Sequence, residues 1–252
     1  MTDGGMVAAY AVPDGLSADD PAPAVLVFSG SDGGLVNARA TAIWLAGLGY
    51  PALAVSYFDS PGQPQELEDV PVETFLTGLT WLREQPGVDT ERVFTFGISR
   101  GGEMALWLAA HHAGEVYGAI APTGAARVFC GYPDASRPAW TLSGAGLPCI
   151  RDAAAPAAAQ VPVEEIAGPV ILACGTADSQ WEACDLLEEA VPRFGDSTPV
   201  RTIVHEEAGH FIAVAPYVPV FLEESGATPA MTHRARVDVW NAVDEVLAGS
   251  RR

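Results

Sequence analysis

The sequence contains no lysine. All 13 of its basic residues are arginine, against 32 Asp and Glu, which gives a formal net charge of −19 at pH 7. So few cations could not neutralise the phosphates of a nucleic acid, and an anionic membrane surface would repel the chain for the same reason. We therefore expect no nucleic-acid partner and no membrane partner. Arginine in place of lysine, with abundant Ala, Gly and Pro, is typical of a GC-rich bacterial genome.

Long apolar runs and targeting signals are also missing. The longest candidate span, residues 211–222, is interrupted by Pro216 and Pro219, and no window has the roughly 20 apolar residues that cross a bilayer. The first 14 residues carry acids and no Arg, and the apolar run at residues 6–12 is too short for a secretory signal.

The four cysteines show no CxxC or His-rich spacing; they are Cys130, Cys149, Cys174 and Cys184. This pattern predicts buried or free thiols in a reducing cytosol, and not a zinc site or disulfides. We expect a soluble cytoplasmic protein that needs no metal and no cofactor.

Apolar runs alternate with helix-like stretches along the chain. Predicted strands cover residues 25–29, 52–58, 92–96, 116–121, 170–174 and 201–204, and predicted helices cover residues 38–48, 72–83, 102–112 and 235–247. Strands that are apolar throughout and separated by helices describe a parallel sheet with helices on both faces. We expect a single α/β domain over residues 1–252, with residues 6–12 supplying at most an edge strand.

Residues 123–163 break this alternation. The segment holds five prolines and an alanine-rich run at residues 153–159, and it is too long for an ordinary connection between a strand and a helix. We interpret it as a cap over a pocket at the carboxyl edge of the sheet, with Trp140 as a candidate substrate contact. The alternative is a plain surface insertion.

The pentapeptide Gly97-Ile98-Ser99-Arg100-Gly101 matches G-x-S-x-G. A serine on a sharp turn from strand to helix has strained backbone angles, and side chains two residues away on either side would collide with neighbouring strands. An apolar strand precedes the motif and a helix follows it. A helix N-cap would account for Ser99, but not for both glycines and both flanks, so we predict that Ser99 is a nucleophile.

A serine nucleophile needs a base, and the base needs an orienting acid. In α/β hydrolases the order along the chain is Ser, then Asp or Glu, then His. His210 lies just past the last predicted strand and is the candidate base, whereas His205 is interpreted as structural and His233 as solvated. Asp178 directly follows the preceding strand and is the candidate acid. Its alternative role is to cap a helix that begins near Gln180.

The oxyanion that forms during acyl transfer needs backbone N–H donors. One candidate is the amide of Arg100, and the other is the amide of Ser31 in the glycine-rich loop after the first strand, with Asp32 as a rival. Gly30 and Asp32 are also expected to border the substrate. Such a loop can cradle phosphates, but GxGxxG spacing and a following lysine are missing, which disfavours a nucleotide-binding module.

Several segments resemble a known family. They are residues 29–35 with Arg39-Ala40, residues 49–58, 93–102 and 163–181, the run Ala-Gly-His-Phe-Ile-Ala-Val-Ala-Pro-Tyr-Val-Pro at residues 208–219, and Trp240. Together they are similar to the catalytic domain shared by acyl-CoA thioesterases and bile acid-CoA:amino acid N-acyltransferases, within the α/β-hydrolase fold. The resemblance spans residues 23–247. It implies a triad of Ser99, Asp178 and His210, and Tyr217 in the last run is a further candidate substrate contact. Members of this family usually carry an N-terminal β-sandwich domain ahead of the hydrolase domain. In this sequence only about twenty residues precede the first predicted strand.

These observations predict a serine hydrolase that cleaves a small acyl ester or thioester, CoA-linked or carrier-linked among the candidates, through an acyl-enzyme on Ser99. Some acyltransferases of the family use Cys as nucleophile, so the serine favours hydrolysis. The alternatives are an acyltransferase or cyclase that uses the same triad, a dienelactone-hydrolase-like carboxylesterase, and a non-catalytic scaffold with this fold.

Overall fold

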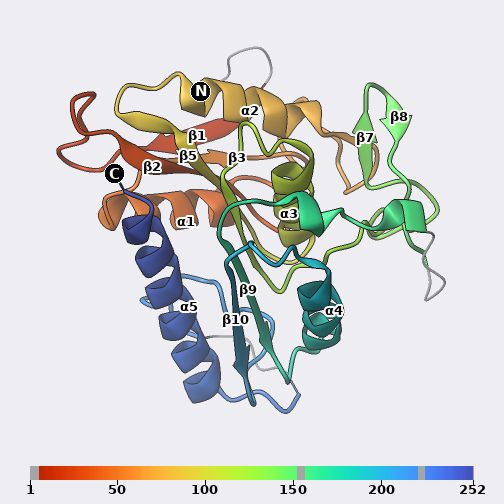
Figure 1. Ribbon diagram of the computed structural model, residues 1–252. Coiled ribbons are helices and arrows are strands. Elements are labelled where there is room, and N and C mark those ends of the chain that lie inside the picture. The colour runs from red at the N-terminus through yellow and green to blue at the C-terminus, as the bar shows by residue number, and fades with distance from the viewer. Residues whose placement is uncertain (1–5, 152–156, 221–224, 252) are drawn as a thin grey trace.

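A seven-stranded sheet forms the centre of the computed structural model, which describes residues 6–151, 157–220 and 225–251 (Figure 1). The strand order is β1-β3-β2-β5-β6-β9-β10. The strands are β1 (Ala8–Ala11), β2 (Ala22–Phe28), β3 (Ala52–Val55), β5 (Val88–Gly97), β6 (Gly118–Pro122), β9 (Val170–Gly175) and β10 (Val200–His205). Strand β1 pairs with β3 antiparallel at one edge, and every other pairing in this sheet is parallel. The predicted, mostly parallel α/β sheet is confirmed.

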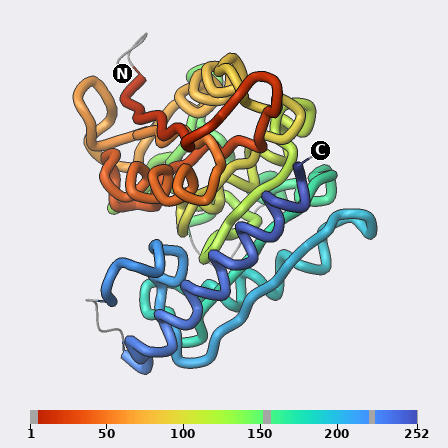
Figure 2. Tube along the Cα trace, turned by 90° about the vertical axis from the view of Figure 1, so that its left-hand side faces the viewer, coloured from red at the N-terminus to blue at the C-terminus, as the bar shows by residue number. Residues whose placement is uncertain are grey.

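Helices cover both faces of this sheet. On one face lie α1 (Val36–Gly47) and α5 (Pro229–Gly249), and on the other lie α2 (Glu73–Arg83), α3 (Arg100–His111) and α4 (Ala183–Ala190). Figure 2 looks onto the first face, where the long α5 crosses in front of the sheet. None of the helices in the described part of the chain is long and apolar enough to cross a membrane.

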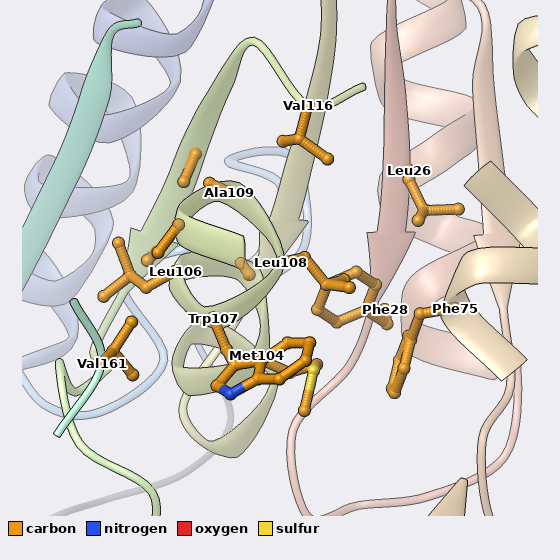
Figure 3. Close-up of a cluster of buried hydrophobic side chains, with 14 of the residues drawn as sticks. Leu26, Phe28, Phe75, Met104, Leu106, Trp107, Leu108, Ala109, Val116 and Val161 are labelled. Atoms are coloured by element: carbon orange, nitrogen blue, oxygen red, sulfur yellow. The ribbon is translucent and has the colours of Figure 1, made fainter. Parts of the chain in front are cut away.

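Two buried cores result, because successive residues of a strand point to opposite faces. In β2, Leu26 and Phe28 face the core under α2 and α3, whereas Val25 and Val27 face the core under α1 and α5. Figure 3 shows the first core, where the ring of Phe28 packs edge-on against Phe75 of α2 with 4.9 Å between ring centroids. This two-sided burial explains why the strands read as continuous apolar runs.

The predicted cap builds a small sheet of its own. Strands β7 (Trp140–Leu142) and β8 (Ala145–Gly146) join β4 (Val70–Pro71) in the order β4-β7-β8. Short 3-10 turns at Ala157–Ala159, Val163–Glu165 and Val191–Arg193 complete the connections. Sequence periodicity could not reveal these strands, because two or three residues are too few to show alternation.

The prediction of reduced cysteines is wrong, since the structure has two disulfides. One joins Cys130 to Cys149, with Cα atoms 4.9 Å apart, and the other joins Cys174 to Cys184, with Cα atoms 5.2 Å apart. The partners are 19 and 10 residues apart in sequence, so no short motif marks them. Tertiary structure brings each pair together. Cys174, near the end of β9, lies beside the first turn of α4, which carries Cys184. The amide of Cys130 donates to the carbonyl of Ile150, the residue after Cys149, at 3.0 Å.

Candidate active site

Ser99 occupies a strained turn between β5 and α3. Its backbone has φ 57° and ψ −121°, a region that a non-glycine residue adopts only when the surrounding structure enforces it. The Ser99 amide lies 3.2 Å from both the carbonyl of Pro122 and Oγ1 of Thr123, at the end of β6. The neighbouring strand thus fixes the turn, and the Ser99 side chain borders a cavity.

Both glycines of the G-x-S-x-G motif are required by close packing. A Cβ on Gly97 would overlap the carbonyl of Gly101, and a Cβ on Gly101 would overlap the carbonyl of Ser29 at the end of β2. A Cβ on Gly30 would lie only 3.1 Å from Cβ of Ser99. The steric interpretation of the motif is confirmed, and the glycine-rich loop after β2 lies directly against the turn that carries Ser99.

Asp178 and His210 form a buried pair. Nδ1 of His210 lies 2.6 Å from Oδ2 of Asp178, and the two side chains are 5% and 2% exposed. The second carboxylate oxygen, Oδ1, accepts the amides of Gln180 at 2.9 Å and Trp181 at 3.3 Å. Asp178 therefore combines the two roles that the sequence left open: one oxygen holds the following backbone turn, and the other holds the histidine.

We call residues 175–183 the acid loop, because they carry Asp178 from the end of β9 to the start of α4. The disulfide between Cys174 and Cys184 closes this loop at its base. Nε1 of Trp181 also donates to the carbonyl of Thr123 at 3.0 Å, which joins the acid loop to the residue beneath Ser99. The loop that carries the Asp178 carboxylate is thus held by a disulfide and by hydrogen bonds.

The loop that carries Ser31 is anchored by Tyr57. The fully buried hydroxyl of Tyr57 lies 2.9 Å from the carbonyl of Ser29 and closer still to the carbonyl of Gly30. Burial raises the pKa of Tyr57 well above its ordinary value of 10.0, so the hydroxyl keeps its proton and donates. In a trans peptide the carbonyl and the N–H point in opposite directions. Holding the Gly30 carbonyl against Tyr57 therefore turns the Ser31 amide away from Tyr57, and Ser31 lines the cavity.

The rival donor, Asp32, lies at the exposed rim, where its carboxylate accepts Nδ2 of Asn37 at 2.5 Å. The second predicted donor, the amide of Arg100, opens α3, and the first amides of a helix have no helical partner. Gly30, Ser31 and Asp32 all border the same cavity as Ser99.

A fully buried carboxylate, Glu103, ties the turn of Ser99 to the predicted cap. It accepts Nε1 of Trp140 at 2.5 Å, the amide of Phe129 at 3.2 Å, and Nε of Arg100 at 3.1 Å. Burial raises the pKa of Glu103, and the charge of Arg100 opposes that rise. No sequence pattern indicates this network, because Glu103 has the spacing of an ordinary helix residue.

Two predicted substrate contacts need correction. Trp140 is completely buried against the rings of Tyr57 and Phe75, at centroid distances of 5.4 and 5.8 Å, and does not line the cavity. Its indole N–H needs a buried partner, and Glu103 supplies it. Tyr217 is 57% exposed and packs its ring on Trp44, 5.0 Å away, outside the cavity wall.

The cavity has a volume of about 450 Å³, within the range of small-molecule sites. Ser31, Ser99 and His210 border its polar end. Residues 211–220 and 227–236 supply most of the remaining wall, which is largely apolar and includes the buried Arg236. Of the described residues in the predicted cap, only Tyr132 lines this cavity.

His205 ends β10 and lies with Nε2 3.0 Å from the Asp238 carboxylate on α5. This agrees with the structural role predicted for it. Among the described residues, no group of three or more His, Cys, Asp or Glu side chains is arranged to hold a metal ion.

Comparison with known proteins links this chain to acyl-CoA thioesterases. Acyl-coenzyme A thioesterase 1 of Rattus norvegicus is 28% identical over 219 residues, covering 79% of this chain and 51% of the relative. Acyl-coenzyme A thioesterase 6 of Mus musculus is 28% identical over 251 residues, covering 88% of this chain and 58% of the relative. The resemblance inferred from the motifs is confirmed, and the chain spans about half the length of the curated relatives it matches.

Solved structures share the fold. A putative dienelactone hydrolase from Klebsiella pneumoniae superposes with a TM-score of 0.63 at 21% identity, covering 96% of this chain and 92% of that one. A thermophilic esterase from Thermogutta terrifontis gives a TM-score of 0.65 at 18% identity, covering 99% and 90%. Residues 58–218, more than half of the chain, match the Prolyl oligopeptidase family. The chain therefore belongs to the Prolyl oligopeptidase family and has the α/β-hydrolase fold.

Proposed function

We propose that the protein is a serine hydrolase that cleaves a small acyl ester or thioester through an acyl-enzyme on Ser99. The observation that carries this proposal is the buried Asp178–His210 pair, whose histidine borders the same cavity as the strained Ser99. The three residues follow parallel strands in the chain order of α/β hydrolases, so they meet at one edge of the sheet. The relatives are acyl-coenzyme A thioesterases, which favours a thioester among the possible substrates.

In the proposed reaction Oγ of Ser99 attacks the acyl carbonyl carbon while Nε2 of His210 accepts the serine proton. Asp178 holds Nδ1 of the imidazole and stabilises the imidazolium. The amides of Ser31 and Arg100 donate to the oxyanion of the tetrahedral intermediate. The bond to the leaving group then breaks, and His210 returns the proton to the departing alkoxide or thiolate. A water molecule, deprotonated by His210, attacks the carbonyl carbon of the acyl-enzyme. His210 then returns that proton to Oγ of Ser99 as the acyl–oxygen bond breaks, which releases the acid and free Ser99.

Labelling and turnover together test this mechanism. A fluorophosphonate probe should label the wild-type protein, and the S99A variant should show neither label nor turnover of N-acetylcysteamine thioesters. H210A should lose about 10³-fold or more in kcat. H205A is the matched control, because His205 pairs with Asp238 outside the cavity; its kcat should stay within about threefold of wild type. Full turnover by S99A would refute the proposal. Adding amine or alcohol acceptors to the same assay detects acyl transfer in place of hydrolysis.

The two disulfides also bear on where this hydrolase works. The predicted cytoplasmic location relied on reduced cysteines, whereas structural disulfides persist in oxidising compartments. We propose an oxidising compartment as the site of action. Titration of free thiols in the denatured, unreduced protein from its native source should find none. Four free thiols would restore the cytoplasmic assignment.

A further inference from the structure

Two arginines are buried in the described part of the chain, and only one of them has a carboxylate partner. Arg100 pairs with Glu103 at 3.1 Å. Arg236, on α5, is 3% exposed and has no Asp or Glu within ion-pair distance among the described residues. This is notable in a chain with 32 acidic residues. Removing a charge from water without a counter-charge costs several kcal/mol.

Arg236 is held beside the proposed base. Its Nε donates to the carbonyl of Phe211 at 2.8 Å, and its Nη1 donates to the carbonyl of Val218 at 2.7 Å. One turn earlier on α5, Oγ1 of Thr232 accepts the amide of Gly209 at 3.2 Å. The same face of α5 therefore holds the chain on both sides of His210, and Arg236 lines the same cavity as Ser99 and His210.

The guanidinium keeps donors for a ligand. It has five N–H groups, and the two hydrogen bonds to carbonyls use two of them. Burial lowers the pKa of Arg236, but an arginine remains charged at neutral pH. Arg236 lines the cavity together with apolar side chains such as Val214 and Val218, and among the described residues of the wall the only other Asp, Glu or Arg is Asp32, at the exposed rim. The cavity thus offers one buried positive charge and free N–H donors.

We propose that Arg236 binds a carboxylate at the far end of the acyl group, so that the preferred substrates are esters or thioesters of short dicarboxylic acids. This inference rests on the proposed hydrolase function and specifies its substrate class. A forked guanidinium binds a carboxylate through charge-assisted hydrogen bonds and supplies the missing counter-charge. A leaving group as large as coenzyme A would not fit a cavity of about 450 Å³, so the group that reaches the buried wall is the acyl chain.

A matched pair of thioesters tests the substrate class. Adipyl and hexanoyl N-acetylcysteamine thioesters have acyl chains of equal length and differ in the terminal carboxylate. The wild-type protein should hydrolyse the adipyl thioester with a kcat/KM about tenfold higher or more. R236Q keeps an amide that can donate to the carbonyls and removes the charge. It should lower kcat/KM for the adipyl thioester by about 10- to 100-fold more than it lowers kcat/KM for the hexanoyl thioester.

Arg201 provides the matched control. It lies on β10 with its side chain 44% exposed and paired with Glu245, so R201Q removes the same charge without touching the cavity. The ratio of adipyl to hexanoyl kcat/KM should stay at its wild-type value in R201Q. A parallel loss of both activities in R236Q would overturn the proposal and leave Arg236 as a clamp on the histidine segment. A wild-type preference for the hexanoyl thioester would also overturn it.

A ligand-binding measurement distinguishes failure of this proposal from failure of the proposed hydrolase function. If neither thioester turns over and no fluorophosphonate adduct forms on Ser99, the hydrolase function fails. Adipate binding, measured by calorimetry, then tests the carboxylate site directly. Adipate should bind the wild-type protein and R201Q, and should bind R236Q at least tenfold more weakly. Should R236Q not fold, the wild-type titration still decides, because lack of adipate binding by the wild-type protein overturns the proposal by itself.

Discussion

Replacing Tyr57 with phenylalanine should slow the reaction without weakening substrate binding. The substitution removes one hydroxyl that lies against the carbonyls of Ser29 and Gly30 and leaves the buried ring in place. The Gly30 carbonyl then loses the contact that orients the next peptide group. The amide of Ser31, on the opposite side of that peptide, is no longer fixed toward the oxyanion.

The magnitude follows from two costs. Buried carbonyls left without a donor should destabilise the fold by about 1–3 kcal/mol. Complete loss of an oxyanion donor costs about 2.7–4 kcal/mol of transition-state stabilisation. Because Tyr57→Phe loosens the Ser31 amide without removing it, we expect a smaller loss, about 10- to 100-fold in kcat. KM should change little, because the donor acts on the oxyanion of the transition state.

The assay is steady-state hydrolysis of a thioester or 4-nitrophenyl ester, with thermal unfolding measured in parallel. Tyr10→Phe is the matched control: the Tyr10 hydroxyl is buried in β1 without a hydrogen-bond partner among the described residues, so its removal should leave kcat unchanged and cost no stability. A kcat within twofold of wild type for Tyr57→Phe, or a loss confined to KM, would refute the positioning of Ser31 by Tyr57.

Three further predictions concern the supports of the site. Gly101→Ala should destabilise the fold by about 3 kcal/mol in urea unfolding, because its Cβ would overlap a backbone carbonyl, whereas Gly114→Ala, in open space, should cost far less; equal losses would contradict the packing. The pair C174S/C184S should lower both Tm and kcat, since that disulfide closes the acid loop. Serine variants of the other disulfide should lower Tm by a similar amount, because each disulfide stabilises the fold by about 3 kcal/mol, and should leave kcat within about twofold. If both pairs of serine variants change kcat equally, the acid loop does not need its covalent closure. Because the pKa of Tyr57 is raised in the folded state, its hydroxyl loses its proton at a higher pH there than in the unfolded state. The stability that this hydroxyl contributes is therefore complete below pH 10 and is lost as the pH rises further, by about 1.4 kcal/mol per pH unit. Urea unfolding between pH 9 and 11 should show this slope for the wild type, and an identical slope for Tyr57→Phe would contradict it.

The sequence predicted those parts of the fold and site that depend on local pattern. Continuous apolar runs located the parallel strands, because burial on both faces leaves no room for polar alternation. The steric demand of a sharp turn located Ser99 through its two glycines. The order of the remaining candidates along the sheet led to Asp178 and His210, which the structure brings into contact at 2.6 Å.

What the sequence missed depends on contacts between distant segments. The disulfides join cysteines on separate elements. Trp140 was predicted to face substrate because it is large, apolar and in a long connection, yet a buried carboxylate 37 residues away determines where its indole lies. Arg236 reads as one more polar residue of an amphipathic helix. Its burial, and the absence of a carboxylate partner for it in the described part of the chain, become visible only when α5 packs against residues 211–218.

The supports of Ser99 and the wall of the cavity come from different parts of this chain. The supports beneath Ser99 come from the first 140 residues, through Tyr57, Glu103 and Trp140, whereas most of the cavity wall comes from the stretch after His210. Side chains in that wall, such as Val214, can be exchanged without altering a hydrogen bond that holds the nucleophile. The architecture is therefore suited to protein engineering. Libraries restricted to the apolar side chains of this stretch, with Thr232 and Arg236 kept because they hold the segment around His210, should change the acyl group that the proposed hydrolase accepts while its reaction machinery stays intact.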